Sequence, residues 1–428
     1  MYKDLLRSIY ERVWGDSQHP SAKDFEKEDY IQVLEEIAVS LWHRESRSAS
    51  VTEMSARLEK TGLQEKFSQF KEGAEKPISR LLTAFYFRQR DEMRDGEERF
   101  EFTHKSFGEY LTARNIVRQV SNLFKMWDLN QEDSSLGWNS VDCLKKWVEL
   151  SGSTALDWAL YRFLGNEITQ KDQNSLEKWQ GMFCQLIGYM LRNGMPMEQC
   201  QLENYHEMSR QARNAEEGLL VVLSLCARET KKLSQIGWPS NTSFGEWLSR
   251  LVEQRKIKLL CLEALICLDL SLAFLYNANL RDANLVDANL SSAILISAIL
   301  ISANLISAKL MEADLSYANL SSANLISANL SDADLSDADL SSAILISADL
   351  SSANLSSANL SDAYLSDAYL SDANLFQTDI EGADFTDAKN LETVKNLHLA
   401  RDLEKAVGIP EDLMKELMRK REAGVLDV

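Results

Sequence analysis

Few residues in this chain have the types and the spacing that catalysis or metal binding requires. His206 is followed by Glu207, but no Cys or Ser nucleophile and no metal ligand stands with them in a recognisable motif. None of the six cysteines is part of a Cys-x-x-Cys pair or has a histidine at zinc spacing. The cysteines are Cys143, Cys184, Cys200, Cys226, Cys261 and Cys267. The sequence therefore predicts no catalytic residue, no metal site and no cofactor, and it favours a protein that is not an enzyme.

Phosphate chemistry is also unsupported by any motif. The chain has no G-x-x-x-x-G-K-[ST] loop that would hold nucleotide phosphates, so we expect no NTP hydrolysis by that route. The first residues, MYKDLLRSIYERVW, carry charges throughout and do not read as a signal peptide, and no stretch approaches the roughly 20 apolar residues that span a bilayer. We therefore expect a cytoplasmic protein with reduced thiols and no membrane contact.

Length and charge limit the class of partner. The chain has 428 residues, of which 45% are hydrophobic and 26% charged, so two or three globular domains are expected. Its formal net charge is −19, which disfavours direct binding to nucleic acid. Any partner attracted by charge should be basic.

A five-residue repeat dominates the second half of the chain. From Ala273 to Asp387 the pattern A-[N/D]-L-x-x runs through 23 units without an insertion, and only Thr378 replaces the alanine. A period of five fits neither a helix nor a simple strand, so the chain must turn at a fixed point in each unit and form a solenoid. We expect the leucine of each unit to fill the axis, the alanine to line a crowded wall, and the other three positions to face water.

This pattern closely resembles the pentapeptide-repeat family. The resemblance implies a right-handed quadrilateral β-helix with four units per coil and between five and six coils. The ends of such a β-helix are exposed sheet edges, which need caps. Residues 257–275 are the expected leading cap, and a helix over 394–421 is the expected cap at the far end.

Residues twenty positions apart should stack on one face of the solenoid. Val286, Ile306, Ile326 and Ile346 then form an apolar ladder, to which Ile294, Ile296, Ile299 and Ile301 add in the first coils. Such a ladder is a candidate contact surface for a protein partner, although β-branched residues also simply fit a β surface.

Most of the acidity of the chain lies in the repeats. Sixteen acidic residues against Arg281 and Lys309 give residues 273–387 a net charge of −14. The candidate acidic surface comprises Asp332, Asp337, Asp362, Asp367 and Asp372. An acidic rod could imitate DNA, as the quinolone-resistance pentapeptide proteins are thought to do at gyrase, whereas the alternative is that the charge only maintains solubility.

The N-terminal region reads as three helices followed by a hairpin. Helices are predicted over 22–44, with Ile31, Leu34, Ile37, Ala38 and Leu41 on one face, over 51–58 and over 78–82. Two β-like runs, AFYFRQR and ERFEFTH, follow, and a further amphipathic helix comes directly after them. This order suggests a winged helix.

The segment F-x-F-x-H-x-S-F-x-E-Y-L-x-A, which begins at Phe100, resembles the winged-helix end of bacterial NACHT-type STAND NTPases. In those proteins the histidine after the hairpin senses bound nucleotide, and His104 matches that position. The ATPase core itself is absent from this chain, so His104 is a vestige, a nucleotide sensor that acts with another chain, or an ordinary core residue.

These observations predict a multidomain α+β chain. Its expected parts are a winged-helix-like domain (1–120), an α-helical connector whose tryptophans are core (121–262), a pentapeptide-repeat β-helix (263–390) and a C-terminal helical cap (391–428). The predicted function is a non-enzymatic scaffold or sensor that binds a protein partner, with a separate NTPase subunit as one candidate. The alternative is a DNA-mimicking inhibitor of an enzyme such as a topoisomerase, and the oligomeric state stays open.

Overall fold

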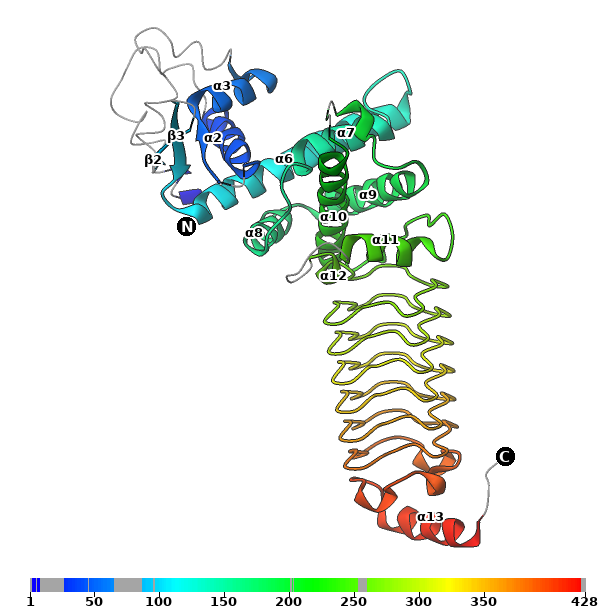
Figure 1. Cartoon of the computed structure of the whole chain (residues 1–428). Coiled ribbons are helices and arrows are strands. Elements are labelled where there is room, and N and C mark those ends of the chain that lie inside the picture. Colours follow the sequence, from blue (N-terminus) through cyan, green and yellow to red (C-terminus); the bar gives the residue numbers. More distant parts are fainter. Residues whose placement is uncertain are drawn as a thin grey trace. The chain divides into compact units, whose positions relative to one another are not determined.

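The computed structural model describes residues 2–4, 6–7, 27–44, 46–64, 87–94, 97–200, 202, 204–252 and 260–424 (Figure 1). Two compact units divide the chain. The N-terminal unit comprises Met1–Ser175 and Met195–Gly218, and the C-terminal unit comprises Leu176–Gly194 and Leu219–Val428.

The N-terminal unit combines helices with a small sheet. Its elements are α2 (Lys27–Trp42), β1 (Ala49–Ser50), α3 (Val51–Lys60), β2 (Phe87–Arg94), β3 (Glu97–Phe102), α6 (Lys105–Glu132), α7 (Ser140–Ser151), α8 (Trp158–Ile168) and the 3-10 turn η2 (Met197–Gln199). The long helices α9 (Gln173–Asn193) and α10 (Tyr205–Thr230) each cross from one unit into the other.

The sheet has the strand order β1-β3-β2, and both pairings are antiparallel. Helix α3 starts at Ser50 because the Ser50 side chain accepts a bond from the Glu53 N–H while the Glu53 carboxylate accepts one from the Ser50 N–H. The first two predicted helices and the predicted hairpin are present as α2, α3 and the pair β2–β3, whereas β1 is an additional strand that the sequence did not predict. The helix predicted over 78–82 lies outside the described residues, so the winged helix stays a prediction.

The core of the N-terminal unit is formed by the predicted face of α2. Its five apolar residues, Ile31 to Leu41, are all buried, and α2 packs against α6. At the start of α6, a Cβ on Gly108 would lie 2.6 Å from Cδ2 of Phe102. Only glycine therefore allows β3 and α6 to approach this closely.

The described part of the predicted connector is mainly helical. Its helical runs form α7 to α10 and α11 (Ser243–Val252), and Trp127, Trp147, Trp179 and Trp247 are buried. Trp138, Trp158 and Trp238 are half-buried, so the prediction of core tryptophans is confirmed for four of the seven. The domain ranges stay predictions, although α6 continues without a break through the boundary placed at residue 120.

The repeats form a β-helix solenoid, as predicted. Parallel bridges join residues twenty positions apart, from Asp269 with Asn289 to Tyr369 with Lys389, so one coil contains four repeats. The leucines of the repeats are buried as expected, and so are the alanines except Ala278, which is half-buried. Thr378, which replaces an alanine, is also fully buried, and its hydroxyl donates to the Leu355 carbonyl at 2.6 Å. The right-handed, quadrilateral path stays a prediction.

Most turns of the solenoid use two short polar side chains. The residue two positions after each leucine has a positive φ, for example +58° at Asp332, where Ser, Asp and Asn are tolerated better than bulky residues. Where the residue before the leucine is Asn or Asp, its side chain accepts a bond from a backbone N–H, as Asn329 Oδ1 does from the Ser331 N–H at 3.0 Å. These side chains take the place of proline, which the repeats lack, and of glycine, which occurs in them only at Gly382.

The leading edge of the solenoid is covered by residues of the same unit. Ser234 pairs with Leu268, and the Ser234 N–H donates to the Cys267 carbonyl at 2.7 Å. The short helix α12 (Leu260–Glu263) adds a bond from the Asn284 N–H to the Leu262 carbonyl. Pairing of the first coil therefore begins with residues 234–241 as well as with the predicted leading segment.

The predicted cap helix over 394–421 is wrong in its first part. The solenoid continues past residue 390 as three six-residue units, each with a 3-10 turn: η3 (Leu391–Thr393), η4 (Leu397–Leu399) and η5 (Leu403–Lys405). Bridges to this coil span 21 to 23 residues, as between Asn374 and Lys395. Helix α13 (Glu411–Ala423) alone forms the helical part of the cap. Arg421 attaches it by donating to the His398 carbonyl at 2.6 Å.

Candidate functional site

The predicted ladder is present on the surface of the solenoid. Val286, Ile306, Ile326 and Ile346 are half-buried and stack one coil above the next. Their carbonyls accept bonds from the neighbouring coil: Asp287 N–H to Ile306 at 3.0 Å, Ser307 N–H to Ile326 at 2.9 Å and Ser327 N–H to Ile346 at 3.0 Å. Backbone pairing on every coil therefore fixes the spacing of the apolar side chains.

Two apolar residues that the sequence analysis did not single out widen the ladder. Ile344 lies two residues before Ile346, and it pairs with Tyr364 of the next coil. The Tyr364 side chain is 49% exposed. Both occupy the position before the leucine, where Asn or Asp is usual, and that departure from the repeat is the signal that could have found them.

The other predicted isoleucines form a belt in a single coil. Ile294 and Ile296 flank the buried Leu295, and Ile299 and Ile301 flank Leu300, in the repeats that precede Ile306 of the ladder. Ile299 is 38% exposed. The preceding coil adds two aromatic rings, Phe274 and Tyr276, which line a groove of about 810 Å³ beside α11. The apolar surface therefore extends from the ladder toward the first coil.

The predicted acidic residues do not form continuous columns. Asp332, Asp337, Asp362, Asp367 and Asp372 are exposed and have positive φ, and they occupy successive turns of two coils. Asp332 and Asp372 share a column, but Ser352 separates them. The Asp367 carboxylate also pairs with Lys389 Nζ at 3.1 Å. The carboxylates form partial rings around the solenoid and lack the unbroken rows along it that a phosphate backbone would present.

Other carboxylates in the repeats stabilise turns. Asp314, Asp334, Asp339 and Asp349 stand before the leucine and Asp384 stands before Phe385, and all five accept bonds from the backbone two residues later. At Asp384, bonds from the side chain and the backbone of Thr386 lower the pKa of the carboxyl below its usual value. Part of the acidity of the solenoid is therefore required by the fold itself.

His104 lies at the N-terminus of α6, as the NACHT resemblance requires, but it is exposed and is no core residue. Its carbonyl accepts a bond from the Phe107 N–H at 3.0 Å. A cavity of about 270 Å³ lies beside it and is lined by Thr103 and Lys105, with His104 outside the lining. The nucleotide-sensing role of His104 stays a prediction.

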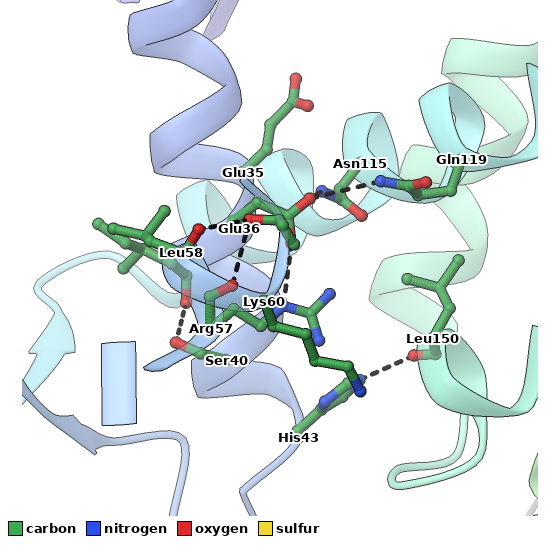
Figure 2. Close-up of polar contacts among 12 residues, drawn as sticks. Glu35, Glu36, Ser40, His43, Arg57, Leu58, Lys60, Asn115, Gln119 and Leu150 are labelled. Atoms are coloured by element: carbon green, nitrogen blue, oxygen red, sulfur yellow. Dashed lines mark hydrogen bonds and ion pairs between the residues drawn. The ribbon is translucent and has the colours of Figure 1, made fainter. Parts of the chain in front are cut away.

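A buried charge cluster in the N-terminal unit was not foreseen. Glu35 and Glu36 of α2 are each 1% exposed (Figure 2). Glu35 accepts bonds from Arg114 Nε at 2.9 Å and Arg118 Nε at 2.8 Å, and Glu36 accepts one from Arg57 Nε at 2.9 Å. Burial raises the pKa of Glu35, while the two arginines oppose that shift. The sequence shows these residues only as charges within helical segments.

His43 connects the end of α2 to α7. Its Nε2 lies 2.7 Å from the Leu150 carbonyl, and because a carbonyl only accepts, Nε2 carries the hydrogen (Figure 2). Burial, with the nearby Arg57 guanidinium, lowers the pKa of His43 to about 4. The imidazole is therefore neutral at pH 7.

Most of the cysteines are buried in the described part of the chain. Cys143, Cys184, Cys226, Cys261 and Cys267 are buried, and Cys200 is half-buried. Burial raises the pKa of Cys143, Cys184 and Cys226 to about 12, which keeps them protonated at pH 7. Within the described ranges, no group of three His, Cys, Asp or Glu side chains could hold a metal ion. The helices described there are too short or too polar to cross a membrane.

Family comparison agrees with the geometry of the solenoid. Residues 273–316, 308–346, 318–356 and 353–389 match the family model described as pentapeptide repeats, with eight copies. No match was found among curated proteins.

Several solved structures are similar to this region. One is HetL of the cyanobacterium Nostoc, a pentapeptide repeat protein involved in heterocyst differentiation regulation, with 32% identity over 33% of this chain and 74% of that chain and a TM-score of 0.20. Another, a pentapeptide repeat protein from the cyanobacterium Cyanothece 51142, has 34% identity over 25% of this chain and 63% of that chain, with a TM-score of 0.20. QnrB1, a plasmid-mediated fluoroquinolone resistance protein, has 16% identity over 37% of this chain and 87% of that chain, with a TM-score of 0.23. Through the repeats in its C-terminal half, the chain belongs to the pentapeptide-repeat proteins.

Proposed function

We propose that this chain is a non-enzymatic interaction protein whose solenoid binds a protein partner through the ladder Val286, Ile306, Ile326 and Ile346. The observation that carries the proposal is the fixed stacking of these half-buried side chains on hydrogen-bonded coils. A surface that is already ordered loses little conformational entropy when a partner binds. The four side chains supply the apolar contact, and the net charge of −14 on the repeats favours a basic partner.

The N-terminal unit is proposed to be a winged-helix-like module that docks on a separate NTPase subunit in the cytoplasm. Its order of helix, strand, helix and hairpin, with His104 at the start of α6, supports this part of the proposal. The chain would then act as a scaffold in which the solenoid, with the right-handed quadrilateral path of its family, holds the partner in a fixed position.

The test is affinity capture of the full-length chain from its native cells, with and without ATP, followed by mass spectrometry. Ile326→Lys combined with Ile346→Lys should abolish capture of the partner. The matched control is Ser336→Lys combined with Ser356→Lys, which places two lysines at the same position of the repeat in another column. Retention of every captured protein by the ladder variant would refute the contact surface, and absence of an NTPase subunit would refute the docking role alone.

DNA mimicry is the weaker alternative because the exposed carboxylates form interrupted rings. It predicts that the purified chain changes gyrase supercoiling at stoichiometric concentration. We expect no change. A clear inhibition that disappears when Asp362, Asp367 and Asp372 are replaced by asparagine would favour mimicry over the ladder.

A further inference from the structure

A cavity of about 470 Å³ in the N-terminal unit has an unusual balance of charge in its wall. Helices α2, α3, α6 and α7 each contribute residues to it. The charged residues of the wall are the four cations Arg57, Lys60, Arg118 and Lys146 and the two carboxylates Glu36 and Glu149. The wall therefore carries two surplus positive charges in a chain whose net charge is −19.

Each carboxylate of the cavity is shared between two cations. Glu36 accepts from Arg57 Nε at 2.9 Å and from Arg118 Nη2 at 3.4 Å. Glu149 Oε2 lies 3.1 Å from Lys146 Nζ and 3.7 Å from Lys60 Nζ. Arg118 Nε also binds Glu35 at 2.8 Å, but Glu35 is itself shared with Arg114, so a positive surplus remains for a bound anion to neutralise.

Arg57 retains donors for such an anion. Its Nε binds Glu36, whereas its Nη1 and Nη2 have no hydrogen-bond partner among the residues that the structure describes. The Arg57 side chain lines the cavity and is 19% exposed, so these donors are available to a ligand there. A guanidinium can offer two parallel N–H groups to one oxyanion, which is the geometry that binds phosphate and carboxylate groups.

We propose that this cavity binds a small molecule that carries phosphate and has at least two negative charges. A phosphate monoester has a charge near −2 at neutral pH, which matches the surplus of the wall. The indole of Trp138, which is half-buried, and the buried Trp147 provide an apolar side to the cavity. The remaining volume is large enough for an organic group attached to the phosphate.

Isothermal titration of the full-length chain with inorganic pyrophosphate, inorganic phosphate and succinate, at one ionic strength, tests the proposal. Pyrophosphate should bind, and Lys60→Gln combined with Lys146→Gln should weaken that binding at least tenfold. These lysines are 67% and 47% exposed, so the substitutions should leave the fold intact. Lys145→Gln is the matched control, because Lys145 is the neighbour of Lys146 on α7 but does not line the cavity.

A second variant examines the guanidinium. Arg57→Lys keeps the charge but removes the paired donors, and it should weaken pyrophosphate binding about tenfold while circular dichroism shows an unchanged fold. The absence of binding at millimolar pyrophosphate would overturn the proposal. Equal binding by wild type and the Lys60/Lys146 double variant would overturn it too. Succinate that binds as tightly as pyrophosphate would overturn the assignment to phosphate.

Discussion

Gly408 shows how tightly the last coil of the solenoid is packed. Its φ is +81°, and a Cβ added there would lie 2.3 Å from the Thr386 backbone nitrogen. Gly424, after α13, has φ +65° but would place a Cβ in open space. An alanine at position 424 would therefore add backbone strain alone, whereas an alanine at position 408 would add both backbone strain and a steric clash.

We expect Gly408→Ala to lower the free energy of unfolding by clearly more than Gly424→Ala. The second change should cost about 1 kcal/mol, which is the cost of a left-handed backbone conformation for an L-residue. Gly408→Ala adds the displacement of the Thr386 backbone. Urea unfolding followed by circular dichroism measures both, and equal losses would show that the last coil is looser than described.

His43 predicts a specific dependence of stability on pH. Its pKa is lowered to about 4 in the folded chain, against an ordinary value of 6.5. The neutral ring is favoured by folding, so its contribution is complete above pH 6.5 and is lost as pH falls through 4. We expect that loss to amount to about 1–3 kcal/mol.

His43→Gln isolates this contribution, because glutamine can still donate to the Leu150 carbonyl and does not titrate. Urea unfolding of both proteins between pH 7 and pH 4 should show a steeper loss of stability in the wild type. Parallel curves for the two proteins would mean that His43 protonates without cost in the folded state.

At the scale of elements, α13 protects the open end of the solenoid. Arg421 holds it by bonds to the His398 and Ala400 carbonyls and to the Glu404 carboxylate at 2.8 Å. Leu417 is the residue of α13 that is buried. An uncovered edge of this kind would be able to pair with a second chain.

Arg421→Gln should loosen α13 and speed amide hydrogen exchange over residues 391–408 at least tenfold, with increased self-association in sedimentation. Arg419→Gln is the matched control, since Arg419 lies on the same helix, is exposed and has no ion pair among the described residues. If both variants exchange like the wild type, Arg421 does not hold the cap.

The elements that could be predicted are those in which a single period decides the structure. The strict five-residue pattern placed the leucines, the alanines and the stacked ladder, and the apolar face of α2 was equally clear. The six-residue units after residue 390 were read as helix because one extra residue per unit breaks the period of five. Their signal was present: Leu391, Leu397 and Leu403 recur every six residues, each directly after Asn or Asp.

The charge cluster and the cavity beside it could not be predicted in this way. Glu36, Arg57 and Arg118 come from three helices, and no local pattern says that they meet. Burial of Glu35 and Glu36 depends on how α2 packs against α6, which is a tertiary property. A charged residue on an otherwise apolar helical face was the available signal, and it does not identify the partner.

At the scale of the whole molecule, charge and apolar surface are distributed unequally. The repeats between Ala273 and Asp387 carry −14 of the net charge of −19, and the same segment carries the ladder. Acidic rings beside a hydrogen-bonded apolar column suit a partner that is basic and has an apolar centre to its binding surface. Binding of a phosphate compound in the N-terminal unit would be a separate property of the chain.

The most direct test of the central claim is site-specific photo-crosslinking in the native cells. A photoreactive phenylalanine analogue is placed at Ile326, in the ladder, or at Ser336, at the same position of the repeat in another column. We expect Ile326 to yield a discrete crosslinked protein with a basic surface, while Ser336 yields none. Crosslinking of the same protein from Ser336 alone, or from both positions equally, would contradict the claim that the ladder is the contact surface.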